Sequence, residues 1–379
     1  MSIYILILFG TFFMFVQSIS KGKDRINHEI ELDIYLFLLC LFLCFGYTTG
    51  TDWRSYEQAY GWVATEYKNL FLFQEPGYVL YTFLFSSLGI DFFHFLIFTK
   101  IVTFYFVFRA IRYYAPCQVI FLSLVFFIAW YAFFLFIDNP LRNLIAVSIF
   151  LSSTKYLREG RIKPYLFMTL LAISFHFSAI VMLLLYYWGR KKYSNRNLIV
   201  IYVICNMLLL SNSLIFSVAS ALFSSVPLVG DKIVAYSTGE GDGGGKLLSF
   251  GYLVHTSFFI FLLCGRKYIE REKNGQMIFM FAILLPIFFR LGLTITVMGR
   301  LQLYIAVFYV VAIGMLFNAF EWRSKLLYVF MILIVSIASC FSYMTKDSRY
   351  VPYTHYLLMD HDMSYDERAE YNSRHSPYK

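Results

Sequence analysis

The stretch QVIFLSLVFFIAWYAFFLFI, residues 118–137, runs for twenty residues without one charged side chain. A helix needs about 20 mainly apolar residues to cross the hydrocarbon core of a bilayer. With 59% hydrophobic residues and a mean hydropathy of +0.64, the chain of 379 residues is too apolar for a soluble domain. The sequence therefore predicts an all-α polytopic membrane protein. Further spans of this kind are expected at 3–19, 32–48, 91–108, 141–157, 198–218, 248–264, 276–293, 301–318 and 325–343.

Two other apolar stretches, 70–90 and 164–188, are interrupted by residues that disturb a helix. Pro76 breaks the first, which turns at SSLGID (86–91), and His176 lies near the middle of the second. We expect each to be a re-entrant pair or a hairpin of short helices, which brings the total to about twelve membrane segments. Irregular backbone at membrane depth persists only beside protein or water, so each break predicts a water-accessible cavity. For the second stretch, the alternative is one long helix with a core histidine.

The basic residues orient these segments. If the first helix runs from outside to inside, the basic clusters share the cytoplasmic side, as the positive-inside rule prefers. The net charge of +9 then reflects cytoplasmic loops and not nucleic-acid binding. The first span opens with apolar residues and lacks a basic n-region, so we interpret it as a membrane helix and not a signal peptide. We predict one transmembrane domain over 1–343 and an extracytoplasmic tail over 344–379.

The same topology gathers unusual polar and aromatic residues on the outer side. Three arginines in or beside apolar spans, Arg142, Arg290 and Arg300, indicate an anion site. Ionisable groups at such positions are retained mostly because they face a ligand, a partner or a water-filled cavity. Guanidinium groups match phosphate oxygens with paired hydrogen bonds. The alternative is that each arginine reaches the lipid headgroups by snorkelling. The outer-side set is Asp52, Trp53, Tyr56, Glu75, Asn139, Arg142, Asn143, His176, Arg290 and Arg300.

Glu75 stands directly before Pro76, and proline is favoured at the first position of a helix, so a helix is predicted to begin there. Glu75 could interact with the amides of that helix, or it could be a partly dehydrated carboxylate whose pKa rises towards that of a useful base. Asp52 is a second candidate base in the expected loop GTDWRSYEQAYGW (50–62). The aromatic residues of this loop could stack on sugar rings or form an interfacial belt.

Two other features carry no predicted chemistry. The six cysteines lie in or beside apolar spans without paired spacing, which argues against a disulfide framework or a zinc site. The segment GEGDGGGK (239–246) lacks the first glycine and the Ser or Thr of a Walker motif, so it is interpreted as a flexible extracytoplasmic connection.

Six motifs occur in order along the chain: GTDWRSY (50–56), EPGY (75–78), PLRNLIAVSIFLSSTKYL (140–157), AISFHFSAI (172–180), GRLQLY (299–304) and VPY (351–353). The ordered set resembles the EpsG-like branch of the Wzy-type bacterial polysaccharide polymerases. One position departs from the family pattern, since Asn143 follows Arg142 where glutamine is common.

The resemblance implies a glycosyltransferase of the bacterial cytoplasmic (inner) membrane whose active site faces the periplasm or exterior. Its donor and acceptor would be undecaprenyl-pyrophosphate-linked oligosaccharide repeat units, with membrane lipid around it and a chain-length regulator as a further partner. No cofactor, metal or nucleic acid is expected. Rival functions are a lipid-linked oligosaccharide flippase or transporter, an O-antigen ligase and an acyltransferase. The expected site residues are Glu75, His176 or Asp52 as the base, Arg142, Arg290 and Arg300 for pyrophosphate, and Trp53, Tyr56, Tyr78, Asn143 and Gln302 for other substrate contacts.

Overall fold

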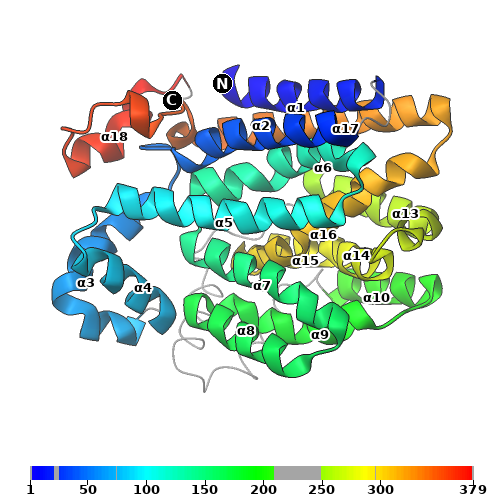
Figure 1. The fold of residues 1–379 in the computed structure, drawn as a ribbon, viewed down its shortest axis with the longest axis horizontal. Helices are drawn as coiled ribbons and strands as arrows, with labels where there is room; N and C mark the ends of the chain where they lie inside the picture. Colours follow the sequence, from blue (N-terminus) through cyan, green and yellow to red (C-terminus); the bar gives the residue numbers. More distant parts are fainter. Residues whose placement is uncertain (1, 21–24, 74, 209–248, 295, 378–379) are drawn as a thin grey trace. The chain divides into compact units, whose positions relative to one another are not determined.

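The computed structural model describes residues 2–20, 25–73, 75–208, 249–294 and 296–377 (Figure 1). Every regular element within these ranges is a helix, which confirms the all-α prediction for the described residues. The chain divides into two compact units, one formed by Met1–Leu184 with Phe317–Lys379 and the other by Leu185–Leu316. The predicted single domain over 1–343 stays a prediction, and the glycine-rich segment 239–246 lies outside the described residues.

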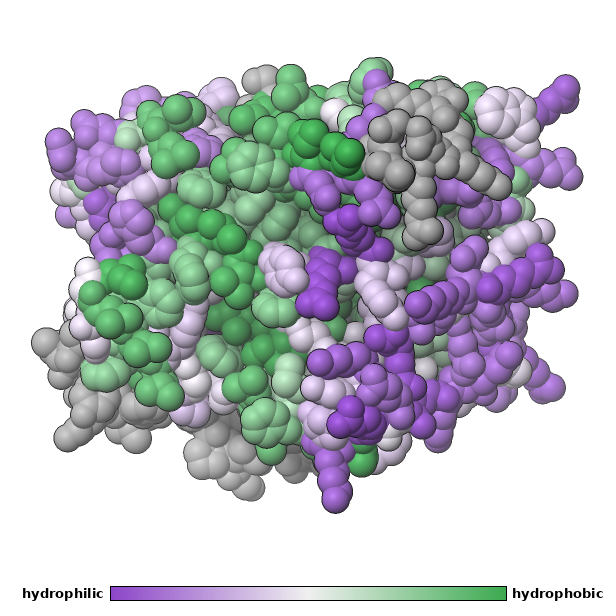
Figure 2. All heavy atoms as spheres, in the orientation of Figure 1, coloured by the Kyte–Doolittle hydropathy of each residue, from purple (hydrophilic) through white to green (hydrophobic). Residues whose placement is uncertain are grey.

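Several helical stretches are long and apolar enough to cross a membrane, so this is a multi-pass membrane protein. The described residues contain five such stretches and three shorter apolar helices, so the count of about twelve segments stays a prediction. Many large apolar side chains are exposed, and Figure 2 shows extensive hydrophobic areas on the face that it displays. The five stretches are Phe92–Tyr114, Cys117–Asp138, Gly275–Leu293, Gly299–Ala319 and Trp322–Lys346.

The most apolar stretch is helical throughout but not uniformly α-helical. After the 3₁₀ turn η1 (Cys117–Val119) and α6 (Ile120–Phe127), it continues as two π-helical segments, η2 (Ile128–Ala132) and η3 (Phe134–Asp138). Helix α17 (Trp322–Lys346) packs beside it and donates hydrogen bonds from Ser339 Oγ to the Ala129 carbonyl (3.0 Å) and from Tyr343 OH to the Phe133 carbonyl (3.2 Å). These bonds satisfy carbonyls in the widened turns.

The π-helical stretch ends at Asn139, whose φ of 64° is left-handed, a conformation that asparagine tolerates better than most residues. Helix α7 (Leu141–Glu159) begins two residues later, after Pro140. Arg142 consequently lies in the first turn of α7.

The predicted loop over 50–62 is wrong for most of its length, because helix α3 (Trp53–Phe73) begins at Trp53. Its buried residues Trp53, Tyr56, Tyr60 and Val63 recur at intervals of about three or four residues and so share one helix face. The three aromatic residues of this face join an aromatic core with residues of α4 (Pro76–Ser87) and α5 (Phe92–Tyr114), among them Tyr78, Phe92, Phe93 and Phe95.

The first predicted break is confirmed. Helix α4 (Pro76–Ser87) begins at Pro76, and the chain then turns through Gly89, whose φ is +73°, into α5 (Phe92–Tyr114). Asp91 caps α5 by accepting hydrogen bonds from the backbone amides of Phe93 and His94.

The second predicted break is confirmed as well. Helix α8 (Ile162–Phe175) ends before His176, and η4 (Phe177–Ile180) and α9 (Val181–Arg190) follow. The hydroxyl of Tyr165 donates to the Met182 carbonyl at 2.7 Å, although these residues would be about 25 Å apart along a straight helix. The alternative of one long helix with a core histidine is therefore wrong.

The end of the chain folds back onto the loop between α2 (Arg25–Cys44) and α3. The tail contains η7 (Ser348–Tyr350), η8 (Tyr356–Leu358) and α18 (Tyr365–His375). The Tyr47 amide donates to the Thr354 carbonyl and the Gly50 amide to the Arg349 carbonyl, each at 3.1 Å. Helix α1 (Ser2–Ser20) joins the same unit, where the hydroxyl of Tyr4 donates to the Tyr350 carbonyl at 2.7 Å.

The second unit contains α10 (Asn195–Leu208), α13 (Phe250–Arg271), α14 (Gly275–Ala282), α15 (Leu285–Thr294), η5 (Thr296–Leu301) and α16 (Gln302–Leu316). Helix α16 packs against α13 and α14, and η5 packs against α15. A side chain built on Gly299 would place its Cβ 3.6 Å from the Gly292 Cα. The segments that carry Arg290 and Arg300 are therefore neighbours within this unit.

Candidate functional site

Three segments far apart in sequence meet at the carboxylate of Glu75. Arg142 Nη1 donates to Glu75 Oε2 at 2.5 Å across a separation of 67 residues. His176 Nδ1 lies 3.0 Å from Glu75 Oε1 across 101 residues, and the Phe177 amide donates to the same oxygen at 3.5 Å. The side chains of Glu75, Arg142 and His176 are 18%, 28% and 12% exposed. The structure thus brings together three of the residues that the sequence predicted for the site.

Local sequence explains the direction of the Glu75 side chain. Glu75 has extended backbone angles, φ −66° and ψ 130°, as expected for a residue before proline. It occupies the N-cap position of α4, but its side chain makes no capping hydrogen bond. The carboxylate instead binds Arg142 of α7 and His176 at the end of α8. The alternative that it binds the amides of its own helix is therefore wrong.

Arg142 is held by two tyrosines as well as by Glu75. The centre of its guanidinium lies 5.8 Å from the ring centroid of Tyr56 and 6.0 Å from that of Tyr78, within the range of cation–π attraction. Its Nε atom is buried and has no hydrogen-bond partner among the described residues. A buried N–H group without a partner is costly, so this donor is suited to an incoming anion.

The charge state of Glu75 follows from its partners. Burial acts to raise the pKa of Glu75, but the hydrogen bond with His176 and the charge of Arg142 outweigh it and lower the pKa to about 2. The raised pKa, one of the two alternatives that the sequence left open for Glu75, is therefore wrong. An ionised carboxylate can only accept hydrogen bonds, so the proton at the 3.0 Å contact belongs to His176 Nδ1.

This pKa shift predicts a pH dependence of stability. Because the pKa of Glu75 is lowered to about 2 from about 4.3 in an unfolded chain, the ionised carboxylate stabilises the fold fully above about pH 4.5. That stabilisation is lost as the pH falls through 4 towards 2. We expect the difference in unfolding temperature between the wild type and Glu75→Gln, measured in detergent, to shrink over this range. A difference that stays constant from pH 7 to pH 3 would contradict the assignment.

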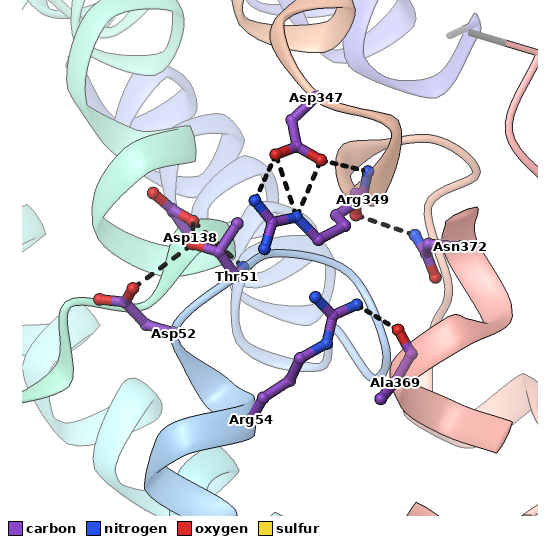
Figure 3. Close-up of polar contacts among 8 residues, drawn as sticks. All are labelled: Thr51, Asp52, Arg54, Asp138, Asp347, Arg349, Ala369 and Asn372. Atoms are coloured by element: carbon purple, nitrogen blue, oxygen red, sulfur yellow. Dashed lines mark hydrogen bonds and ion pairs between the residues drawn. The ribbon is translucent and has the colours of Figure 1, made fainter. Parts of the chain in front are cut away.

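Asp52 belongs to a second polar cluster of the same unit, shown in Figure 3. The Asp52 amide donates to the Asp138 carbonyl at 3.2 Å, and the Thr51 hydroxyl donates to the carboxylates of Asp52 (3.4 Å) and Asp138. Sequence reasoning missed Asp138, although an aspartate that closes the most apolar stretch was a visible signal. The role of Asp52 as a base stays a prediction.

Nearby contacts join this second cluster to the tail. Arg349 pairs with Asp347, and the Arg349 carbonyl accepts from Asn372 Nδ2 at 3.0 Å (Figure 3). Arg54 Nη2 donates to the Ala369 carbonyl at 2.5 Å. The cluster thus fixes the α2–α3 loop against both the end of η3 and the tail.

Two of the predicted substrate contacts lie deep in the packing. The indole of Trp53 is 0% exposed and its Nε1 donates to the Thr48 carbonyl at 3.2 Å. Asn143 is also 0% exposed, and its Nδ2 donates to Ser178 Oγ at 3.0 Å. This second bond ties α7 to η4 directly after His176, a connection that sequence reasoning missed. Substrate contact by these residues, and by Tyr56 and Tyr78 beside Arg142, stays a prediction.

Three predicted residues lie in the second unit. Arg290 is 3% exposed, and its guanidinium lies 5.0 Å from the ring centroid of Tyr252. Arg300 is in η5 and Gln302 is the first residue of α16. Their contact with a substrate bound at Glu75 stays a prediction.

The described residues show neither a disulfide bond nor a group of metal ligands. All six cysteines lie within the described ranges and are free thiols, with Cys40 Sγ 3.8 Å from Cys44 Sγ. Over residues 2–20, 25–73, 75–208, 249–294 and 296–377, no group of three or more His, Cys, Asp or Glu residues is arranged to hold a metal ion.

Comparison with known proteins identifies a family that matches most of this chain. The model of the EpsG family matches residues 32–355, a range that contains Glu75, Arg142 and His176 together with Asp52, Arg290 and Arg300. No curated protein and no solved structure matches the chain. Since the family model covers most of the 379 residues, this multi-pass helical membrane protein belongs to the EpsG family, a family of Wzy-type polymerase-like membrane proteins.

Proposed function

We propose that this protein is a glycosyltransferase that polymerises undecaprenyl-pyrophosphate-linked oligosaccharide repeat units on the outer side of the bacterial cytoplasmic membrane. The observation that supports it most is the meeting of Glu75, Arg142 and His176, because it combines an oriented imidazole with a cation suited to phosphate. Family membership supports the polymerase class.

In this proposal His176 is the general base and Glu75 orients it. Glu75 accepts the proton of His176 Nδ1, so neutral His176 carries its lone pair on Nε2. The arrangement follows the logic by which a carboxylate fixes the tautomer of a catalytic histidine. Among the three candidate bases, His176 is preferred to Glu75, because a carboxylate with a pKa of about 2 is a weak base at neutral pH.

The reaction is a single displacement. An acceptor sugar hydroxyl attacks the donor's anomeric carbon and forms the new glycosidic C–O bond, while the bond from that carbon to the pyrophosphate oxygen breaks. The electron pair leaves with the pyrophosphate, and the hydroxyl proton passes to His176 Nε2. The anomeric centre is inverted. A positioned base contributes about 10²- to 10⁴-fold to such a step.

Arg142 would stabilise the leaving pyrophosphate. Its buried Nε–H lacks a partner among the described residues, and a phosphate oxygen would supply one. Arg142 also lies in the first turn of α7, where the helix dipole favours an anion. Arg290 and Arg300 are proposed to contribute further positive charge, which makes a metal-independent displacement feasible.

The test is lengthening of a lipid-linked glycan by the purified protein. Protein in detergent, with no membrane gradient, is incubated with lipid-linked repeat units, and products are separated by length. A ladder of successive repeats is the expected result. A flippase or transporter would give no lengthening, a ligase would transfer glycan only to a different acceptor, and an acyltransferase would leave the glycan length unchanged, so each of these outcomes would overturn the proposal.

A further inference from the structure

Gly77 lies where the first turn of α4 crosses the last turn of α8. A Cβ built on Gly77 would lie 2.3 Å from Ser174 Oγ, 2.9 Å from Ser174 Cβ and 2.9 Å from the Ser174 carbonyl oxygen. Ordinary contacts of a Cβ are 3.4–4 Å, so no side chain fits here without movement. The backbone of Gly77 is not left-handed, so glycine is required at this position for space and not for its backbone angles.

This crossing lies beside the proposed site on both helices. Glu75 is two residues before Gly77, and His176 is two residues after Ser174. The Glu75–His176 hydrogen bond of 3.0 Å therefore depends on how closely α4 approaches α8. A methyl group on Gly77 would separate the two helices by roughly 1 Å, and a hydrogen bond stretched beyond about 3.5 Å is lost.

A second contact limits how the site could adjust. Asn143 Nδ2 donates to Ser178 Oγ at 3.0 Å, which holds the segment after His176 against α7. Glu75 is likewise bonded to α7, through Arg142, so α7 holds the residues on both sides of the crossing. The displacement would therefore fall on Glu75 and its two partners.

We propose that Gly77 is a positioning residue for the glycosyl transfer, an inference that rests on the proposed function of Glu75, Arg142 and His176. It does not touch the reacting atoms. It acts by letting the carboxylate of Glu75 reach the imidazole of His176. Pro76 fixes where α4 begins, Glu75 carries the negative charge, and Gly77 allows α4 and α8 to approach closely. A misplacement of about 1 Å at a catalytic group can cost on the order of 10²-fold in rate.

The experiment compares Gly77→Ala with Gly61→Ala in the purified glycan-lengthening assay. Gly61 is a matched control, because it lies inside α3 and a Cβ there would meet no atom within 4 Å. Gly77→Ala is expected to lower kcat by about 10- to 100-fold with KM changed less than threefold, since the misplaced groups act in the transition state. Gly61→Ala is expected to keep wild-type activity.

A rescue variant separates positioning from general damage. Ser174→Gly removes the two side-chain atoms nearest the added methyl group and leaves only the carbonyl contact at 2.9 Å. Adding it to Gly77→Ala should restore kcat by about tenfold. The inference is overturned if Gly77→Ala keeps activity within twofold of wild type, or if the double variant stays as inactive as the single one.

A third variant distinguishes failure of the positioning role from failure of the proposed function. Glu75→Gln is measured in the same assay. If Glu75→Gln keeps full activity, the proposed role of the site fails. If Glu75→Gln is inactive and Gly77→Ala is fully active, only the positioning role fails.

Discussion

Glu75→Gln is expected to shorten the glycan to about one repeat unit, with the rate of lengthening reduced by about 10²- to 10⁴-fold. The neutral amide cannot pair with the Arg142 guanidinium as the carboxylate does at 2.5 Å. It also removes the anionic acceptor that keeps the proton of His176 on Nδ1. One substitution therefore disturbs both the base and the phosphate-binding cation. The measurement is the glycan ladder of a polymerase-deficient host that expresses the variant at the wild-type protein level.

Matched controls use residues whose exposed ion pairs lie away from the site. Glu159→Gln removes a carboxylate that pairs with Arg161, and Arg112→Ala removes an arginine that pairs with Asp33. Both should give normal ladders, because exposed ion pairs contribute little. Arg142→Ala should behave like Glu75→Gln. Normal ladders from Glu75→Gln and Arg142→Ala would remove both residues from the mechanism.

Gly50→Ala is expected to cause a large loss of stability, on the order of 3 kcal/mol or more. Gly50 has a φ of +101°, which side-chain-bearing residues rarely adopt. An added Cβ would lie 2.1 Å from the Ile137 carbonyl oxygen and 3.2 Å from the Asp138 Cα, both backbone atoms that cannot rotate away. The loop would have to leave the end of η3, so that the Thr51 bonds to Asp138 would also be lost.

Thermal unfolding of the detergent-purified variant measures this effect. Gly10→Ala is the control, since Gly10 lies in α1 and a Cβ there would meet nothing within 4 Å. The control should unfold at or slightly above the wild-type temperature, because alanine favours a helix by about 1 kcal/mol over glycine. An unfolding temperature for Gly50→Ala equal to that of wild type would show that the loop adapts without cost.

The sequence alone predicted the helical membrane class and both chain breaks. An uninterrupted apolar run is a local feature of the sequence, so its composition is enough to identify it. Pro76 and His176 could be recognised because each places a helix-disturbing or polar residue inside such a run. Counting the basic loops then put Glu75, Arg142 and His176 on one side, and the structure shows these three in contact.

Other features depend on information that a scan of the sequence does not contain. Helix α3 was mistaken for a loop because its apolar residues occupy one face, so its average hydropathy resembles that of a polar connection. The lowered pKa of Glu75 depends on partners 67 and 101 residues away, whereas burial alone predicts the opposite direction. The hydrogen bond from Ser339 of α17 to the Ala129 carbonyl in the π-helical segment η2 likewise joins residues 210 positions apart.

The unit that contains Glu75 is made from the two ends of the chain, Met1–Leu184 and Phe317–Lys379. During synthesis, the ribosome completes all of the second unit before it makes the segment that binds the α2–α3 loop. The hydrogen bonds from Thr48 to Thr354 and Asn372, and from Arg54 to Ala369, can therefore form only after the second unit has been translated. Until then, the nascent N-terminal helices must remain in the bilayer without this closing contact.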